Sequence, residues 1–457
     1  MKKFAPGFSI ILLSLLFALS THAQQKDEHK YSILRIKITP AILSKMQAAG
    51  VYIDEGERSK DNQFTSVFSA YERKKLEQAG ISFVVVNDDA TLEFQQRNAL
   101  DIKQHPNPKL EAADASVNCN FPVPNLFELG TMGGYLKYEE MLAALDSMHA
   151  KYPALCSEKI PISNTTKTWE GRPLYYVKIS DKVSSNEANE PKVLYTGVHH
   201  AREAMSLINL IYFMEYILEN YGTNADAKRI INNCELYFVP CVNPDGYIYN
   251  ETTNPNGGGM WRKNRRKQGV VTNGVDLNRN YGFQWGLNSG SSGNANSDTY
   301  RGPAAFSEAE SQLIKQLSID KKFTTSMHHH SYAEILFYPF DYTNANCADA
   351  VLMKRAGDSL TACNNYSVEH GAGSLGYLAS GTTPDWMYGD ETSKPKCYSF
   401  TNEIGGNSFW PSRSKIIPLC QEQVLLNMRL ALFALSVPKN IHNIKSPVPV
   451  YGAPALE

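Results

Sequence analysis

The sequence has no excess of charge of one sign. Its 457 residues include 45 Lys and Arg against 46 Asp and Glu, which gives a net charge of −1. No overall field therefore attracts nucleic acid or an anionic membrane, and we expect neither as a partner. The length is enough for about two or three domains. A hydrophobic share of 42% is also enough to build a large core.

Long apolar runs are also scarce. The strongly apolar run near the start, residues 8–20, is too short to span a bilayer. It follows Lys2 and Lys3 and precedes Ala23, a pattern typical of a cleaved signal peptide. We therefore expect residues 1–23 to be a signal peptide of a secreted or periplasmic protein, without stable membrane insertion. An uncleaved anchor is the alternative.

The chain has no Cys-x-x-Cys pair, which argues against a zinc site built from cysteines. It does contain eight cysteines, and an even number in an exported protein permits disulfide bonds. Eight cysteines allow about 105 pairings. The short spacings favour the pairs Cys347–Cys363 and Cys397–Cys420.

Residues 31–88 contain an internal half-repeat. Residues 46–51 (MQAAGV) resemble residues 76–81 (LEQAGI), and each copy reads as a helix end closed by glycine before an apolar strand. With a strand before each helix, the predicted order is β-α-β-β-α-β, which is typical of a small ferredoxin-like α+β domain. It contains no cluster of titratable residues, so we expect a structural or regulatory role.

Residues 97–125 are rich in Pro, Asn and Ala without apolar periodicity, which indicates a linker. Its basic residues Arg97, Lys103 and Lys109 would be accessible to a processing protease if the linker is exposed. The expected organisation is a signal peptide (1–23), an N-terminal α+β domain (24–96), the linker (97–125), a main domain (126–438) and a loose tail (439–457).

Strands and helices alternate through the main domain. Helical spacing predicts helices over 138–151, 204–220 and 415–435. Short apolar runs predict strands at 174–179, 192–197, 235–241, 323–330 and 335–338. Asn243–Gly246 is predicted to be a turn, and Ser307 with Glu310 is predicted to form a capping box at the start of a helix. The pattern predicts an α/β fold with a mixed, mainly parallel central sheet flanked by helices.

The stretch Lys192–Glu203 (KVLYTGVHHARE) joins one of these strands to the next helix. It delivers His200 and Glu203 to the carboxyl end of the strand, where open α/β sheets collect ligands. Zinc binds both donor types and keeps an open position beside three protein ligands. The third ligand would come from residues 328–330, where His328 and His330 share one face of a strand. Ordinary strand histidines are the alternative.

Eight sequence words then occur in one order over residues 197–403: GVHHAREAMS, NPDGY, MWRKNRR, GVDLNRNYGF, YRGPAAFSEAE, HHSYAEILFYP, LASGTTPDW and SFTNE. This series resembles the zinc metallocarboxypeptidases of the pancreatic carboxypeptidase A and B type, from about Gly133 to Leu435. The resemblance implies that His200, Glu203 and His330 bind one Zn²⁺ per chain. His199, His328 and His329 would then have supporting roles.

The same resemblance assigns the catalytic residues. Glu403 in SFTNE matches the general base, which takes a proton as water attacks the peptide carbonyl. Arg262 matches the arginine that stabilises the charge developing on the carbonyl oxygen. Without the resemblance, Glu403 would read as a surface salt-bridge residue, and WRKNRRK as a solvated basic loop.

The substrate-binding residues are also implied by the resemblance. Asn278 and Arg279 match the clamp for the free C-terminal carboxylate of a substrate, which an arginine fork suits. Tyr377 matches the tyrosine that closes over the substrate, and Arg202 matches an arginine further out on the substrate path. The implied function is release of single C-terminal residues from peptides or proteins by a monomeric enzyme.

Two positions depart from the family pattern. Pro384 occupies the position that usually sets specificity and supplies no negative charge, which favours an apolar, aromatic or broad preference. Asp385 and Asp390 are the alternative sources of an acid in the pocket. Asn402 beside Glu403 is the second departure. The competing hypotheses are a zinc peptidase that cuts γ-glutamyl bonds of cell-wall peptides, and an inactive binding module on the same fold.

Overall fold

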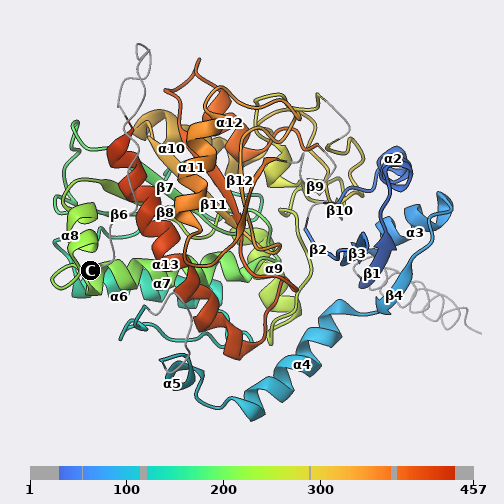
Figure 1. Ribbon diagram of the computed structural model, residues 1–457, viewed down its shortest axis with the longest axis horizontal. Coiled ribbons are helices and arrows are strands. Elements are labelled where there is room, and N and C mark those ends of the chain that lie inside the picture. The colour runs from blue at the N-terminus through green and yellow to red at the C-terminus, as the bar shows by residue number, and fades with distance from the viewer. Residues whose placement is uncertain (1–29, 54, 114–120, 288–289, 372–377, 438–457) are drawn as a thin grey trace, which may run out of the picture.

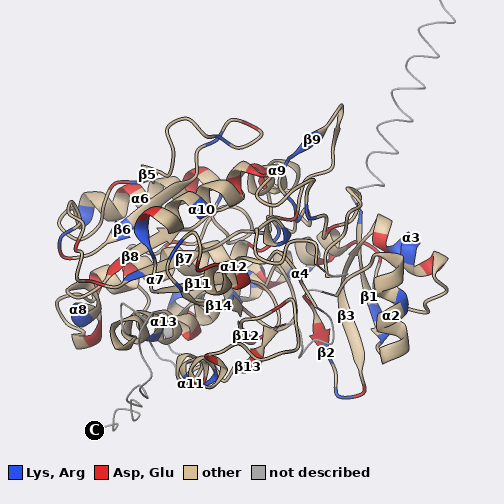
Figure 2. Ribbon diagram, turned by 90° about the horizontal axis from the view of Figure 1, so that it is seen from above, with Lys and Arg blue, Asp and Glu red and all other residues tan. Residues whose placement is uncertain are grey.

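The computed structural model describes residues 30–53, 55–113, 121–287, 290–371 and 378–437. Two β-sheets, each with its own helices, form a small N-terminal unit and a much larger second unit (Figure 1). Acidic and basic residues are interspersed over both units (Figure 2). The predicted signal peptide and C-terminal tail lie outside the described residues.

The N-terminal unit is built on a four-stranded antiparallel sheet. Its elements are β1 (Tyr31–Lys37), α2 (Pro40–Ala49), β2 (Glu57–Arg58), β3 (Gln63–Ser69), α3 (Ala70–Gln78) and β4 (Val84–Asn87). The strands lie in the order β2-β3-β1-β4, which is the ferredoxin-like arrangement. The element order is the one that the half-repeat predicts. Gly50 ends α2 at a φ of 76°, a conformation that glycine adopts without strain.

Helix α4 (Ala90–Gln104) connects the two units and continues into the segment predicted as a linker. Arg97 donates a hydrogen bond from Nη1 to Ser412 at 2.7 Å, and Asp101 accepts one from the Ser414 hydroxyl at 2.6 Å. A short helix α5 (Pro108–Ala113) follows. The first part of the predicted linker is therefore ordered, because its polar side chains bind the larger unit.

The larger unit contains an eight-stranded mixed sheet. In spatial order its strands are β13 (Ser367–His370), β12 (Ile335–Tyr338), β14 (Tyr398–Glu403), β11 (Thr325–His330), β7 (Lys192–Thr196), β8 (Glu235–Val239), β6 (Tyr175–Ile179) and β5 (Ile160–Pro161). The central strands β14, β11, β7 and β8 are parallel, and antiparallel pairs lie on both sides of them. The mixed, mainly parallel α/β sheet is confirmed.

Helices cover both faces of this sheet (Figure 1). The helices of this unit are α6 (Tyr138–Lys151), α7 (Ala204–Glu219), α8 (Ala225–Ile231), α9 (Pro244–Thr253), α10 (Ala309–Lys321), α11 (Ala350–Leu360), α12 (Thr383–Gly389) and α13 (Arg413–Ser436). Strands β9 (Lys267–Gln268) and β10 (Val271–Thr272) form a separate short hairpin. Along β7, Val193 and Tyr195 pack into the core beneath α7 and α13, while Leu194 packs into the core with α10. This alternation fixes the register of the strand.

Some local predictions need correction. Asn243–Gly246 is the start of α9, where the Asn243 side chain accepts a hydrogen bond from the Gly246 amide, and is not an isolated turn. Helix α10 begins after Glu308, because Ser307 donates its hydroxyl to the Glu308 carboxylate instead of capping the helix.

The two cysteine pairs favoured by their spacing do not form. Cys347, Cys397 and Cys420 are buried free thiols in the structure, so both pairings are wrong. Helix α13, which the sequence predicts as a core helix, packs against α7 and is buried along much of its length. Among the described residues, no helix combines the length and apolarity needed to cross a membrane.

Candidate active site

The residues singled out by their motifs meet at the carboxyl ends of β7, β11 and β14. Strand β7 ends at Thr196, and the chain then passes Gly197, where a Cβ atom would lie 2.8 Å from the Pro240 carbonyl oxygen. The turn that follows brings His200 and Glu203 to the start of α7. Strand β11 ends at His330, directly beside Glu403 in the parallel pairing with β14.

His200, Glu203 and His330 form one buried group. Their potential ligand atoms all lie within 4.8 Å of one another. Nδ1 of His200 lies 2.6 Å from Oε1 of Glu203, and Nδ1 of His330 lies 2.9 Å from Oε2 of the same carboxylate. Among the described residues, this is the fully buried group of His, Cys, Asp or Glu arranged to hold a metal ion.

The chemistry of this group fits zinc. Two imidazole nitrogens and one carboxylate are a donor set that catalytic zinc takes in other proteases. Burial raises the pKa of Glu203 to about 7, against the opposing effect of His200, and a bound cation would favour the ionised form of this carboxylate.

Asp276 is a further residue of this cluster, and its motif alone assigns it no role. Its Oδ1 lies 3.1 Å from Nε2 of His200, and its Oδ2 accepts hydrogen bonds from Arg262 at 3.0 and 3.2 Å. A carboxylate on the outer nitrogen of a ligating histidine fixes the ring and its tautomer. The signal was present in the word GVDLNRN, where Asp276 stands two residues before Asn278.

Asp276 is itself held as a carboxylate. Burial alone would raise its pKa, but Arg262 and His200 lower the pKa of this carboxyl well below its usual range. The metal group and Arg262 are thus tied together by one ionised side chain.

The neighbouring histidines bind protein groups. Nε2 of His199 lies 3.0 Å from the Tyr281 hydroxyl, and Nδ1 of His328 lies 2.8 Å from Oγ1 of Thr196. His329 points the other way, with Nε2 2.9 Å from Oδ1 of Asn427 on α13. Burial lowers the pKa of His199 and His328 well below the usual range and that of His329 to about 3, so all three are neutral.

Asn402 points away from the metal group. Its amide lies 3.1 Å from Nδ1 of His329 and donates to Gln423 at 2.8 Å. Glu403 comes next on β14 and therefore faces the opposite side, toward His330. The departure at Asn402 thus supports the core and leaves the neighbouring carboxylate at the site.

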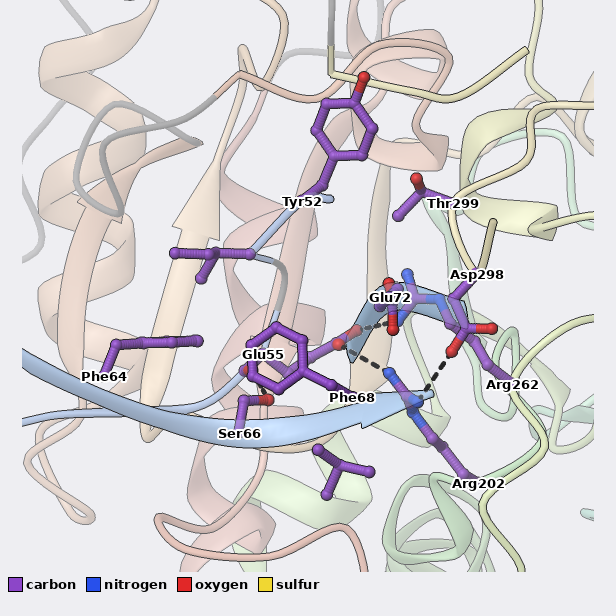
Figure 3. Close-up of a pocket in the computed structure, with 12 residues that line it drawn as sticks. Tyr52, Glu55, Phe64, Ser66, Phe68, Glu72, Arg202, Arg262, Asp298 and Thr299 are labelled. Atoms are coloured by element: carbon purple, nitrogen blue, oxygen red, sulfur yellow. Dashed lines mark hydrogen bonds and ion pairs between the residues drawn. The ribbon is translucent and has the colours of Figure 1, made fainter. Parts of the chain in front are cut away.

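Arg262 and Arg202 are both buried, and they line one pocket although they come from different segments (Figure 3). Arg262 binds Asp276, as described above. Nη1 of Arg202 lies 3.4 Å from Oδ2 of Asp298, and its guanidinium stacks over Phe409 at 4.2 Å. The run WRKNRRK is therefore not a solvated loop at Arg262.

The expected carboxylate clamp lies in a short 3₁₀ turn, η1 (Leu277–Arg279), directly after Asp276. Oδ1 of Asn278 accepts hydrogen bonds from the amide and hydroxyl of Thr383, at 2.9 and 3.0 Å. Arg279 donates to the carbonyl oxygens of Gly290 and Asn278. Tyr377 lies outside the described residues.

The carboxylates near Pro384, those of Asp385 and Asp390, bind groups of the protein itself. Pro384 is buried in the first turn of α12. The Asp385 carboxylate accepts hydrogen bonds from the backbone amides of Asp341 and Tyr342 at 2.8 to 3.1 Å. Asp390 accepts from Trp386 Nε1 at 2.8 Å and from the Thr392 hydroxyl at 2.7 Å. Both acids are therefore engaged by the protein itself.

Comparison with known proteins agrees with this geometry. The Peptidase_M14 family, zinc carboxypeptidase, matches residues 141–425, which is more than half of the chain. The chain belongs to the zinc carboxypeptidase family. Membership makes it a metallocarboxypeptidase, a hydrolase whose relatives depend on zinc and act on peptides.

Relatives of two types match at similar identity. Carboxypeptidase A1 of Rattus norvegicus is 31% identical over 358 residues, covering 76% of this chain and 77% of the relative. Carboxypeptidase A1 of Homo sapiens is 34% identical over 320 residues, covering 66% and 71%. Carboxypeptidase B of Astacus astacus is 31% identical over 300 residues, covering 63% and 93%.

Solved structures share the fold. The carboxypeptidase A from Helicoverpa armigera superposes with a TM-score of 0.68 at 21% identity, covering 90% of this chain and 99% of that chain. Thrombin activatable fibrinolysis inhibitor superposes with a TM-score of 0.65 at 22% identity, covering 89% and 99%.

Proposed function

We propose that this zinc carboxypeptidase removes single residues from the C-termini of peptides or proteins, with His200, Glu203 and His330 holding its one zinc ion. The observation that carries the assignment is the buried His-Glu-His group at the ends of β7 and β11, with Asp276 joining it to Arg262. When bound, zinc would lower the pKa of a water molecule and polarise the peptide carbonyl.

The protein side chains perform the remaining steps. Glu403 accepts the proton of the attacking water and delivers it to the leaving amine nitrogen, so that the peptide C–N bond breaks. Arg262 donates hydrogen bonds to the carbonyl oxygen as negative charge develops there. Asp276 holds the Arg262 guanidinium for this role through bonds of 3.0 and 3.2 Å.

Exopeptidase action requires a group that binds the free C-terminal carboxylate. We assign this role to Asn278 and Arg279, with Tyr377 closing over the substrate and Arg202 contacting the chain further out. Support comes from the position of η1, which follows Asp276 directly and therefore lies beside the metal group. A bidentate guanidinium–carboxylate pair is the strongest available contact for this terminus.

The preferred C-terminal residue is apolar or aromatic, or the preference is broad. Pro384 brings no charge, and the carboxylates of Asp385 and Asp390 already accept hydrogen bonds from the protein. A C-terminal Lys or Arg would thus find no free acid among these three positions.

We further propose that the protein is an exported zymogen. Helix α4 ties the N-terminal unit to the larger unit, and its last turn contains the exposed Lys103. Arg97 and Lys109 are less suitable for cleavage, because Arg97 binds Ser412 and Lys109 donates to the Phe127 carbonyl oxygen. Cleavage after Lys103 would separate the N-terminal unit from the enzyme.

Mass spectrometry of a mixed peptide pool tests the proposed function. Zinc-loaded chain cut after Lys103 is incubated with the pool, with and without a chelator. Stepwise loss of single C-terminal apolar residues that stops with chelator and returns with zinc is the expected result. Internal cleavage would show that the clamp is misassigned. Attack on γ-glutamyl cell-wall peptides alone, or no cleavage despite bound zinc, would favour the competing hypotheses.

A further inference from the structure

One carboxylate at the metal site comes from the N-terminal unit. Glu55 lies in the loop between α2 and β2, and its side chain is 4% exposed. Its Oε1 contacts Nη1 of Arg262 and lies 3.5 Å from Nδ1 of His200. Its Oε2 lies 3.3 Å from Nη2 of Arg202 (Figure 3). Glu55 therefore touches three residues of the catalytic machinery at once.

The atom of His200 that Glu55 approaches is the one that would bind the metal. Nε2 of His200 faces Asp276 at 3.1 Å, so Nδ1 is the nitrogen directed toward Glu203 and His330. The Glu55 carboxylate thus lies between the metal group and the arginine that stabilises the carbonyl oxygen. This is where the reacting carbonyl of a substrate must bind.

Contacts with the core and the sheet of the N-terminal unit hold Glu55 at this position. Val51 and Ile53 are buried in the core of the N-terminal unit, and the carbonyl oxygen of Glu55 accepts a hydrogen bond from the Ser66 hydroxyl on β3. Gly56 follows at a φ of 153°, with no room for a side chain because a Cβ atom would lie 2.5 Å from the Phe64 ring. The chain is therefore packed at Val51 and Ile53 before Glu55 and at Gly56 directly after it.

The charges explain why a carboxylate is bound here. Arg202 already contacts Asp298, and Arg262 already contacts Asp276. Glu55 bridges the two guanidinium groups and adds a negative charge next to a site that binds a dication. Charge-assisted hydrogen bonds of this kind are about twice as strong as neutral ones. An amide of the same shape would lose this attraction, and its NH2 group could not accept a hydrogen bond from the guanidinium that it faces.

We propose that Glu55 is an internal mimic of the reaction product, which holds the site closed in the uncut chain. Hydrolysis leaves a new carboxylate on the shortened peptide, at the position of the carbonyl that reacted. Glu55 presents the same group to Arg262 and the metal ligands, but offers no peptide bond to cleave. This inference rests on the proposed function and names the residue through which the N-terminal unit inhibits it.

The test compares uncut, zinc-loaded chains in which Glu55→Gln or the control Glu57→Gln has been introduced. Glu57 is the first residue of β2, two residues after Glu55, and its side chain is exposed. The first readout is the rate at which a small bidentate chelator removes zinc. We expect at least a tenfold faster removal from Glu55→Gln than from wild type, and an unchanged rate for Glu57→Gln. Hydrolysis of a short peptide by the uncut chain should rise at least tenfold in parallel.

A second variant guards against a folding defect. Glu55→Asp keeps the charge but withdraws the carboxylate by one methylene, so it should give an intermediate rate of zinc removal. If both Glu55 variants lose zinc at the wild-type rate while the cut wild-type chain hydrolyses peptides, the inference fails and the proposed function stands. If the cut chain hydrolyses nothing, the proposed function fails, and the rate of zinc removal still decides the role of Glu55.

Discussion

The two sheets of the molecule contribute to the active site in different ways. The eight-stranded sheet presents residues at the ends of three neighbouring parallel strands, so the backbone itself sets the spacing of His200, His330 and Glu403. The four-stranded sheet contributes Glu55 from the loop before β2, and Ser66 and Phe68 of β3 line the pocket that contains Arg202 and Arg262 (Figure 3). The proposed catalytic groups therefore all lie in the larger unit, whereas the proposed inhibitory group belongs to the smaller one.

Loss of a metal ligand is expected to have the largest effect. Replacing His330 with Ala removes one of three protein ligands, so the variant should purify without stoichiometric zinc. The kcat/KM of the cut chain should fall by at least about a thousandfold. His149→Ala, on the remote helix α6, is the control. Elemental analysis and peptide hydrolysis check both, and full zinc content in His330→Ala would contradict the assignment.

Loss of the general base should separate chemistry from metal binding. Glu403→Gln keeps the shape of the side chain but cannot accept the proton, so kcat should fall by about 10² to 10⁴. Zinc content should stay at the wild-type level. The neighbouring Glu334 has an exposed side chain, and Glu334→Gln should leave kcat unchanged. A mere rise in KM for Glu403→Gln would mean that this residue only binds substrate.

Asp276 should have a smaller effect, on metal affinity. Asp276→Asn keeps a polar group beside His200 but removes the negative charge, so zinc affinity should weaken by about 10- to 100-fold. Asp298→Asn is the matched control, because Asp298 contacts Arg202 and no metal ligand. Competition with a chromogenic chelator measures both. Equal affinities for the two variants would show that Asp276 does not orient His200.

The smallest predicted effect is a pH dependence that arises in the N-terminal unit. Glu72 is buried at the junction of the units, near Asp298 and Arg202 of the larger unit (Figure 3). Lys263 of the larger unit and Tyr31 of its own unit also face it. Burial, and then Asp298, raises the pKa of Glu72 from 4.5 to about 7. The folded chain therefore binds this proton more tightly than the unfolded chain does.

The sign of the dependence follows from this difference. Stability is greatest below pH 4.5 for this group and falls as pH rises toward about 7, by up to about 3 kcal/mol in total. Glu72→Gln should remove this loss and still cap α3, since glutamine also serves at that position. Thermal unfolding of both chains between pH 5 and pH 8 measures it. Parallel profiles would contradict the prediction.

The sequence predicts the larger unit well, because the patterns that indicate its strands and its site residues lie in short, continuous stretches of the chain. Buried strands such as 192–196 are short apolar runs, and the proposed metal ligands stand at their carboxyl ends in recognisable words. The half-repeat likewise predicts the element order of the smaller unit, since each copy contains its own helix end and glycine. The helical start of the linker was missed, because its stability comes from contacts of Arg97 and Asp101 with residues more than 300 positions away.

Contacts between segments explain the other differences. Asp276 stands in the word GVDLNRN, but its contacts appear only when the fold brings it to both His200 and Arg262. Glu55 has no motif around it, and its partners Arg202 and Arg262 lie 147 and 207 residues away in the chain. The cysteine pairs failed for the same reason, since nearness in sequence says little about distance in the fold.

In our proposal the active site is already complete in the uncut chain and is closed by the N-terminal unit. The most direct test compares the peptidase activity of the cut chain with that of the uncut chain. Uncut chain, and chain cut after Lys103 and separated from its N-terminal fragment, are loaded to equal zinc content and assayed on one peptide. We predict a kcat/KM at least about a hundredfold higher for the cut chain, as expected if fewer than about one uncut molecule in a hundred is open. Equal activity of the two forms at equal zinc content would contradict it.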